Sequence, residues 1–534
     1  MGRYFALIGM ALGVGVGVIL TGAGFAAGSW VLMVAVPFTA LGIYDVLQAR
    51  HTLWRNYPII SHMRWVFEGI RPEIRQYLIE SDADAFPFNR EQRSLVYQRA
   101  KNELQTIPFG TQQDVYASDY TFFSHSFKPE HVDPNALRIT VGGPDCKQPY
   151  SCSLLNISAM SFGSLSGNAI AALNRGAKIG GFAHDTGEGG ISKYHWSQGG
   201  DIIWELGSGY FGCRTNKGGF DADIFAEKAK HPQIKMIEIK LSQGAKPGHG
   251  GMLPGAKVTQ EIADARGVPI GTDCISPAAH SEFSTPLGLI DFISQLRELS
   301  GGKPVGFKLC VGHRREFMAV IKAMLKRDVY PDFIVIDGKE GGTGAAPLEF
   351  SNSVGLPLRD GLHFVNMALI GAGIRDRIKL GASGKIVSGA DMARAMGLGA
   401  DWCNSARGFM FSIGCIQARA CHTNRCPTGV ATQDPLRQSG LHVGDKAQRV
   451  ANFHRNTMTG FAEMVGAMGL TSPHEITFNM INFREPHLSG TSLVRLEPGQ
   501  LDRADCPEEY AMHWRVAHAE SFHRLGHTSS AAAD

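Results

Sequence analysis

The stretch KPVGFKLCVGHRREFMAVIKAMLKRDVYPDFIVID, residues 303–337, contains two short apolar runs on either side of a helical pattern. The runs 303–309 and 332–337 are nearly continuous in apolar residues, which is typical of strands buried on both faces of a parallel sheet. Between them, residues 316–328 repeat apolar side chains at the spacing of an amphipathic helix. The stretch therefore predicts a strand–helix–strand unit, the repeating element of α/β folds.

The same pattern recurs from about residue 152 onward. Short apolar runs, each ending in a glycine-rich or polar loop, alternate with helical stretches. The eight expected strands are 153–160, 180–185, 234–241, 268–275, 303–309, 332–337, 378–383 and 400–405. Eight such strands with helices between them predict an α/β fold, the (β/α)8 TIM barrel. A doubly wound sheet is the alternative, and the lack of an early GxGxxG loop weakens it.

The N-terminal stretch is apolar throughout. No charged residue occurs from Tyr4 to Tyr44, and roughly 20 apolar residues suffice for one membrane span. The stretch predicts a transmembrane helical hairpin over about 4–22 and 28–46, with a cleaved secretory signal as the alternative. Arginines follow the second span closely, at 50, 55, 64, 71 and 75. By the positive-inside rule we expect a protein of the inner (cytoplasmic) membrane whose catalytic domain faces the cytoplasm.

Four segments are expected along the chain. They are two transmembrane helices (1–46), an α-rich linker and cap (47–150), the barrel (151–440), and a C-terminal helical extension and tail (441–534). The net charge of +3, with no long basic run, argues against nucleic acid as a partner. The ten cysteines are scattered apart from one trio, which favours a reducing compartment over a secreted disulfide framework.

Glycine-rich loops follow the last three expected strands. Such loops in barrels often hold a phosphate, because exposed backbone N–H groups bind anions. The loops EGGTGAAP (340–347), GASGK (381–385) and CNSARGF (403–409) together predict an anion cradle. Its expected residues are Gly341, Gly342, Thr343, Gly344, Ser383, Gly384, Ser405, Ala406 and Arg407.

Lys308 ends the fifth expected strand, where it would point into the barrel mouth. A buried lysine without a partner is costly, so a ligand or a carboxylate must meet it. Beside a flavin it would stabilise negative charge on the reduced pyrimidine ring. An ordinary internal salt bridge is the alternative.

Polar side chains occupy the loops after the second and third expected strands. Glu188 lies between glycines in HDTGEGG (184–190), and Gln243 and Lys246 lie in KLSQGAKPGHGGMLPG (240–255). A carboxylate, an amide and a lysine facing a barrel mouth can bind and protonate an oxo-acid. Arg266 lies further on, in IADARGV, where the pattern alone fits a solvated helix residue.

Cys415, Cys421 and Cys426 lie close together in GCIQARACHTNRCP (414–427). Zinc held by Cys421, Cys426 and His422 is one interpretation, although adjacent residues rarely both ligate one ion and no fourth cysteine completes a finger spacing. An iron–sulfur cluster of three irons, with one cysteine per iron, is a second. The third is a site without metal.

Six motifs occur in the order found in one known family. They are SAMSFGSLS, TGEGG, QGAKPGHGGMLPGAKV, ISPAAH, GGTGAAP and GCIQARACHTNRCPTGVATQDP, and they span about 150–437. In combination they resemble the FMN-binding synthase domain of glutamate synthases. The resemblance implies a (β/α)8 barrel that carries FMN and a [3Fe-4S] cluster. It also implies an enzyme, an oxidoreductase that reductively aminates 2-oxoglutarate to L-glutamate.

The resemblance further implies roles for single positions. The cysteine trio would ligate the cluster, and Lys308 would lie beside the flavin pyrimidine. The segment against the flavin ring would be Ala159, Met160 and Ser161. The residues that hold 2-oxoglutarate would be Gln243, Lys246 and Arg266, with the cations on its carboxylates. Glu188 would handle ammonia or protons, so Glu188 and Lys246 are the expected catalytic residues.

The chain also departs from the family pattern. The family's synthase subunit begins with a glutaminase domain, whereas this chain begins MGRYF and continues into the apolar stretch. We therefore expect ammonia, or a separate glutaminase partner, to supply nitrogen. His280, Ser281 and Glu282 stand where the family has HHD, and Tyr210 stands where it has arginine.

A stand-alone, membrane-anchored relative of the glutamate synthase domain is the expected protein. No pyridine-nucleotide domain is evident in the sequence, so an electron donor such as ferredoxin is expected, with a membrane quinone pool as the alternative. One alternative is a related imine or amine chemistry, such as N-alkylated glutamate formation. The other is a membrane-attached flavin and iron–sulfur electron-transfer module without synthase turnover.

Overall fold

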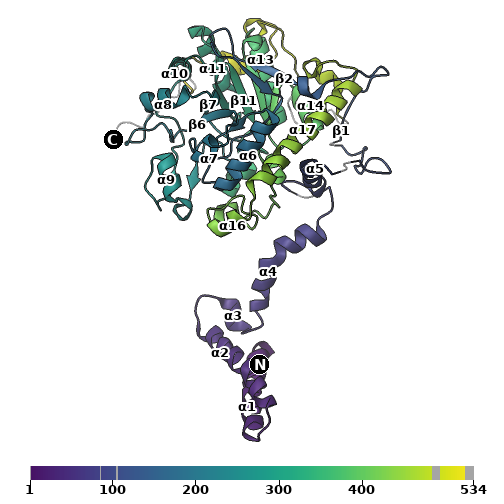
Figure 1. Ribbon diagram of the computed structural model, residues 1–534, viewed down its shortest axis with the longest axis vertical. Helices are drawn as coiled ribbons and strands as arrows, with labels where there is room; N and C mark the ends of the chain where they lie inside the picture. The colour runs from purple at the N-terminus through teal and green to yellow at the C-terminus, as the bar shows by residue number, and fades with distance from the viewer. Residues whose placement is uncertain (1, 84–85, 104–105, 119, 484–493, 524–534) are drawn as a thin grey trace. The chain divides into compact units, whose positions relative to one another are not determined.

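The computed structural model describes residues 2–83, 86–103, 106–118, 120–483 and 494–523 (Figure 1). The chain divides into two compact units, Met1–Asn89 and Arg90–Asp534. The segment boundaries expected at 46, 150 and 440 stay predictions.

The first unit is helical. Helices α1 (Phe5–Gly22) and α2 (Ala27–Leu47) pack against each other, and α3 (Thr52–Asn56) and α4 (His62–Ile74) follow. A Cβ on Gly28 would lie 2.4 Å from the Thr21 backbone nitrogen, so glycine is what lets the two helices approach here. Both helices match the expected hairpin to within one residue at each end. They are long and apolar enough to cross a bilayer, a property that signal sequences and buried core helices share.

The second unit is built on a closed barrel of eight parallel strands (Figure 1). In chain order these are β4 (Leu155–Ile157), β5 (His184–Asp185), β6 (Ile202–Leu206), β7 (Ile234–Lys240), β10 (Val305–Leu309), β11 (Phe333–Asp337), β12 (Lys379–Ser383) and β13 (Trp402–Ser405). Strand β13 pairs with β4 and closes the barrel, with Cys403 opposite Leu155. The predicted (β/α)8 fold is therefore confirmed.

The expected strand at 268–275 is wrong. Only β9 (Cys274–Ile275) is extended there, and it pairs antiparallel with β8 (Met252–Leu253) outside the barrel. Pro269 and Gly271, the latter at φ 70°, interrupt the run. Proline lacks the N–H that a central strand needs, and glycine weakens a strand interior.

The third barrel strand is β6, in the run IIWEL. Glu205 sits inside this run and gives it a charged residue at a fully buried position. The loop that begins at Lys240 therefore follows the fourth strand rather than the third. Lys308 stays on the fifth strand, and the cysteine trio still follows the eighth.

Helices surround the barrel. Those that follow its strands are α6 (Gly167–Gly180), α7 (Lys193–Trp196), α8 (Ala222–Ala229), α9 (Gln260–Arg266), α10 (Pro286–Leu299), α11 (Arg314–Arg327), α12 (Leu348–Ser353), α13 (Leu358–Gly371), α14 (Gly389–Gly397), α15 (Arg407–Ser412) and α16 (Pro435–Ser439). The long helix α17 (Val443–Ala467) packs against α6 and α5 (Arg90–Lys101) and lies within the expected C-terminal helical extension. A last helix, α18 (Glu508–Arg515), packs on α11.

Two small sheets lie outside the barrel. Strand β2 (Arg138–Val141) forms a hairpin with β3 (Tyr150–Ser153), just before the first barrel strand. Strand β1 (Thr121–Phe123) pairs with β14 (Ile481–Phe483), which joins the segment before the barrel to the segment after it.

Candidate active site

The carboxyl ends of the barrel strands carry the residues predicted to form the site. In chain order these are Ala159, Met160 and Ser161 after β4, Glu188 after β5, Gln243 and Lys246 after β7, Lys308 on β10, Gly341, Gly342, Thr343 and Gly344 after β11, Ser383 and Gly384 at the end of β12, and Ser405 and Arg407 at β13 and α15. Arg266 ends α9, in the excursion between β7 and β10. Parallel strands of a barrel end at one face, so this is the face where barrel enzymes place their chemistry.

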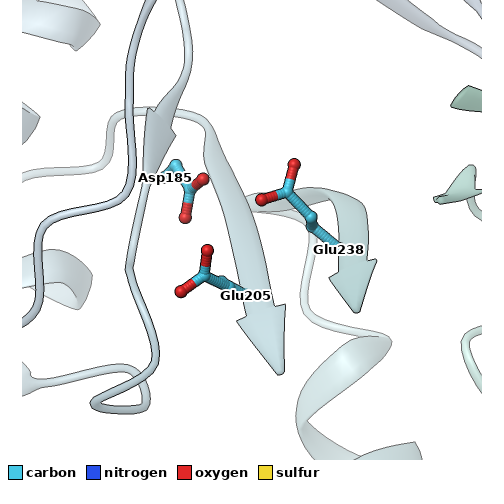
Figure 2. A group of neighbouring side chains, drawn as sticks. All are labelled: Asp185, Glu205 and Glu238. Carbon is cyan, nitrogen blue, oxygen red and sulfur yellow. The ribbon is translucent and has the colours of Figure 1, made fainter. Parts of the chain in front are cut away.

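Lys308 is buried among carboxylates from neighbouring strands. Its Nζ forms ion pairs with Glu205 of β6 and, at 3.2 Å, with Glu238 of β7. Figure 2 shows Asp185 of β5 directed toward the same space, and one oxygen of each carboxylate lies within 4.8 Å of the others. Burial alone would lower the pKa of Lys308, but these carboxylates raise it well above its usual range. An internal salt bridge, the alternative that the sequence left open, is therefore present.

The carboxylate cluster, formed by Asp185, Glu205 and Glu238, holds more negative charge than Lys308 can balance. All three residues are 1% exposed, and unpaired charge is costly inside a protein. Burial raises the pKa of Glu238 to about 7, with Lys308 opposing the shift and Glu205 adding to it. Burial and the two neighbouring carboxylates likewise raise the pKa of Asp185 well above its usual range. At neutral pH the cluster therefore retains a proton.

Glu188 lies at the centre of a group of cations. Lys240 Nζ is 3.1 Å from Glu188 Oε2 and also donates to Gln243 Oε1 at 2.6 Å. Burial alone would raise the pKa of Glu188, but Lys240, Lys246 and Arg266 lower it to about 2. The carboxyl group is thus ionised at neutral pH. Sequence analysis did not predict Lys240 as a site residue, because a lysine at the end of an apolar run is typical of an ordinary strand end.

Two glycines make room for the Glu188 side chain. A Cβ on Gly251 would lie 2.3 Å from Glu188 Oε1, and a Cβ on Gly207 would lie 2.8 Å from Glu188 Cβ. Distances this short exclude any side chain unless Glu188 moves. The GHGG stretch after β7 therefore leaves the space that this carboxylate fills.

Lys246 and Arg266 are buried cations. Both are 4% exposed. Burial lowers the pKa of Lys246, with Glu188 opposing the shift and Lys240 adding to it. Arg266 donates to the Phe162 carbonyl oxygen at 3.1 Å, its guanidinium lies over the Phe211 ring, and its Nε has no hydrogen-bond partner. The sequence pattern alone suggested that Arg266 lies on a solvated helix face, and this burial contradicts that interpretation.

The glycine-rich loop after β11 lies against Arg407. A Cβ on Gly342 would lie 1.9 Å from Arg407 Nη2, so the guanidinium occupies the place of a side chain there. Ser383 Oγ is 3.3 Å from Ser158 Oγ. The Ser405 hydroxyl, in contrast, donates to the Ile386 carbonyl oxygen at 2.5 Å. That donor is therefore engaged by the protein itself.

The cysteine trio lies beside the same arginine. Burial, Cys421 and Cys426 raise the pKa of Cys415 to about 12, against opposing effects of the Gln417 N–H and Arg407. Burial alone would raise the pKa of Cys426 as well, but hydrogen bonds from the 428–431 segment lower it. One residue, Arg407, thus lies against the loop after β11 and interacts electrostatically with the thiols of Cys415 and Cys421.

The spacing of the trio bears on which metal it could hold. Within the described residues, the three sulfur atoms are not all within 4.8 Å of one another, nor do His422, Cys421 and Cys426 form such a group. Tetrahedral zinc with bonds of about 2.3 Å to sulfur brings its sulfur ligands to about 3.8 Å from each other. At least one pair of these sulfur atoms therefore lies further apart than two thiolates on one zinc ion, and the cluster stays a prediction.

Residues 138–471 match the family model described as a conserved region in glutamate synthase. The chain belongs to the glutamate synthase family. It is 38% identical over 516 residues to the glutamate synthase large subunit-like protein YerD of Bacillus subtilis (strain 168), covering 89% of this chain and 96% of that protein. It is 36% identical over 329 residues to the archaeal glutamate synthase (NADPH) of Methanocaldococcus jannaschii, covering 61% of each. Among solved structures, the recombinant flavin-binding domain of baker's yeast flavocytochrome b2 is 13% identical, with a TM-score of 0.40 and coverage of 76% of this chain and 82% of that one.

This member of the glutamate synthase family places Tyr210 and His280 in one buried pair. His280 Nδ1 is 2.9 Å from the Tyr210 hydroxyl, and His280 Nε2 is 2.8 Å from the Lys240 carbonyl oxygen. A carbonyl oxygen only accepts, so Nε2 carries the hydrogen and Nδ1 accepts from the tyrosine. The pair therefore holds the backbone of Lys240, whose ammonium contacts Glu188.

Proposed function

We propose that this chain is an FMN and [3Fe-4S] dependent oxidoreductase that makes L-glutamate from 2-oxoglutarate and ammonia with electrons from an external donor. The observation that carries the proposal is the charge balance around Glu188. Lys240, Lys246 and Arg266 act on this one carboxylate, which leaves an excess of about two positive charges in a buried space. A dicarboxylate such as 2-oxoglutarate supplies the two negative charges that would neutralise it.

Lys246 and Glu188 are the proposed catalytic groups. When ammonia adds to the keto carbon, water must leave before an imine forms, and the leaving oxygen needs a proton. Lys246 would donate it, because a buried ammonium with a lowered pKa gives up its proton more readily than an exposed lysine. The ionised Glu188 would accept hydrogen bonds from the N–H groups of ammonia and hold the nitrogen near that carbon. Gln243, fixed by Lys240, would add an amide contact to the substrate.

FMN would be held at the carboxyl ends of β11, β12 and β13. Gly341 and Gly342 offer backbone without side chains, and Thr343, Gly344, Ser383, Gly384 and Arg407 would complete the phosphate cradle. Ser405 would contribute its backbone only, because its hydroxyl donates to the Ile386 carbonyl oxygen. The fit rests on Gly342, where the Arg407 guanidinium lies against bare backbone. Ala159, Met160 and Ser161 would lie against the ring. Bound there, FMN would supply hydride transfer to the imine carbon.

Lys308 is our proposed partner for the pyrimidine side of the flavin. An ammonium has three N–H groups, and one of them donates to Glu205, while Glu238 forms an ion pair without a hydrogen bond. Another N–H would be available to the ring. The cysteine trio would hold the [3Fe-4S] cluster. The cluster would supply electrons at the same mouth of the barrel.

The partners and the location follow from the sequence and stay proposals. Helices α1 and α2 would anchor the chain in the inner (cytoplasmic) membrane, with the catalytic domain on the cytoplasmic side. A protein such as ferredoxin would deliver electrons, and a separate glutaminase could deliver ammonia.

The decisive experiment mixes the reduced full-length protein, purified in detergent, with 2-oxoglutarate and ammonium and measures L-glutamate. We expect a yellow-brown protein whose flavin spectrum changes on addition of 2-oxoglutarate and which releases glutamate. Arg266→Ala should weaken the spectral change at least tenfold, whereas Arg327→Ala, on the surface of α11, should leave it intact. Flavin and cluster present without glutamate would favour the electron-transfer module or a different amine. A colourless protein would contradict the glutamate-forming enzyme, the electron-transfer module and the enzyme for a different amine alike.

A further inference from the structure

A cavity of about 720 Å³ lies at the opposite end of the barrel from the proposed site. Lys379, the first residue of β12, and Asp401, which precedes β13, line it, together with parts of α13, α14 and β2. These are the amino-terminal ends of strands whose carboxyl ends carry Ser383 and Ser405. Catalytic groups of barrel enzymes lie at the carboxyl ends, so the proposed reaction has no use for this cavity.

The charges that line the cavity are mostly positive. Arg375 is engaged, since it donates to Asp401 Oδ2 at 2.9 Å and to the Gly399 carbonyl oxygen at 2.8 Å. Three further cations line the space: Arg138, Lys379 and Arg495. In the part of the chain that the structure describes, none of these three forms an ion pair with a carboxylate.

Lys379 is the cation best able to bind a ligand, because the other two donate hydrogen bonds to the protein. Arg138 donates to the Gly181 carbonyl oxygen at 2.8 Å, and Arg495 donates to Asn479. Across residues 2–483 and 494–523, leaving out the masked positions, the Lys379 ammonium has neither a hydrogen bond nor an ion pair. Burial lowers the pKa of His474, with Asp401 opposing the shift and Lys379 and Arg375 adding to it. His474 is thus a neutral hydrogen-bonding group beside the ammonium.

Apolar side chains form the rest of the wall. Those that face the space include Met367, Ile370, Met396, Leu398, Ile476 and Leu496. The volume lies within the roughly 300–1,000 Å³ typical of small-molecule sites, which combine an apolar lining with a few placed polar groups. We propose that this cavity binds a small amphipathic anion, with a phosphate or carboxylate head at Lys379 and an apolar body against α13 and α14.

Hexyl phosphate titrated calorimetrically into the full-length protein in detergent tests the proposal. Its two halves, inorganic phosphate and hexanol, serve as probes of the head and the body, and hexanoate distinguishes a carboxylate head from a phosphate one. We expect at least one of the two amphipathic anions to bind at least tenfold more tightly than either half. Lys379→Gln should weaken that binding about tenfold, because a charge-assisted hydrogen bond is lost. Lys178→Gln, on the exposed face of α6, is the matched control and should bind like the unaltered protein.

Ile370→Trp provides a second variant that keeps Lys379 and fills the apolar part of the cavity. It should abolish binding of the amphipathic anion while the thermal midpoint stays within a few degrees of that of the unaltered protein. Equal affinity in Lys379→Gln and Lys178→Gln would overturn the proposal, as would binding of hexanol as tight as that of hexyl phosphate. Absence of binding by both anions would overturn it as well.

Discussion

Replacing Glu238 by glutamine tests the charge balance inside the barrel. Burial raises the pKa of Glu238 from its ordinary 4.5 to about 7. Between these values the folded protein retains a proton that the unfolded chain has lost, so the free energy of unfolding falls as the pH rises. The loss is about 1.4 kcal/mol per pH unit, or about 3 kcal/mol in all. It is absent below about pH 4.5 and complete above about pH 7. Glutamine resembles the protonated carboxyl group but does not ionise, so the Glu238→Gln protein does not lose this free energy as the pH rises.

We therefore expect Glu238→Gln to unfold at a higher temperature than the unaltered protein at pH 8, and at nearly the same temperature at pH 5. Thermal unfolding of the full-length protein, followed by circular dichroism at both pH values, measures the difference. Glu298→Gln, on the exposed surface of α10, is the matched control and should shift neither midpoint. If the gap between Glu238→Gln and the unaltered protein were the same at pH 5 and pH 8, the argument for a retained proton would be refuted.

Further predictions concern the mouth of the barrel. Gly342→Ala places a Cβ 1.9 Å from Arg407, so the purified protein should lose most of its flavin absorbance; Gly312→Ala, where a Cβ meets no atom within 4 Å, should keep it. Gly251→Ala displaces Glu188 and should weaken the spectral response to 2-oxoglutarate at least tenfold without loss of flavin. Cys421→Ser should abolish the iron–sulfur signal in electron paramagnetic resonance, whereas Cys506→Ser should leave it; a retained signal in the first would remove Cys421 from the ligand set. Because Lys246 must be protonated to act, the rate of glutamate formation should decline on the alkaline side at a pH below the usual range of lysine, and Lys246→Gln should be slow at every pH.

The barrel is predictable from the sequence because seven of its strands lie in short, largely apolar runs that end in glycine-rich or polar loops. The error at the third strand has a physical cause. Residues 268–275 are apolar enough to resemble a strand although proline and glycine prevent one, and the run of β6 is only five residues long and carries Glu205. A pattern of apolar residues cannot show that a carboxylate is buried, since burial depends on a partner, Lys308, from a strand about a hundred residues away.

The site is predictable to a lesser degree. Loops at the carboxyl ends place Glu188, Lys246 and the cradle at one face, as the strand order requires. Lys240 and the three residues of the carboxylate cluster escape sequence reasoning because each lies within a strand, where charged side chains are normally assigned to the exposed face. Arg266 is a case in which sequence reasoning fails for a residue in a helix rather than in a strand. Its helix position suggests solvent, and only the packing of α9 against the Phe162 and Phe211 loops buries it.

The position of Arg407 has a consequence for assembly of the holoprotein. The same guanidinium lies against Gly342 and interacts with the thiols of Cys415 and Cys421, so any group that orders one neighbourhood also restricts the arginine that the other needs. Two sites that share an ordered residue are coupled, and the coupling is reciprocal. For the proposed FMN and iron–sulfur cluster, insertion of the cluster should therefore tighten retention of the flavin, and flavin should in turn protect the iron from chelators. Protein produced under iron starvation would then be pale both because it lacks the cluster and because it retains less flavin.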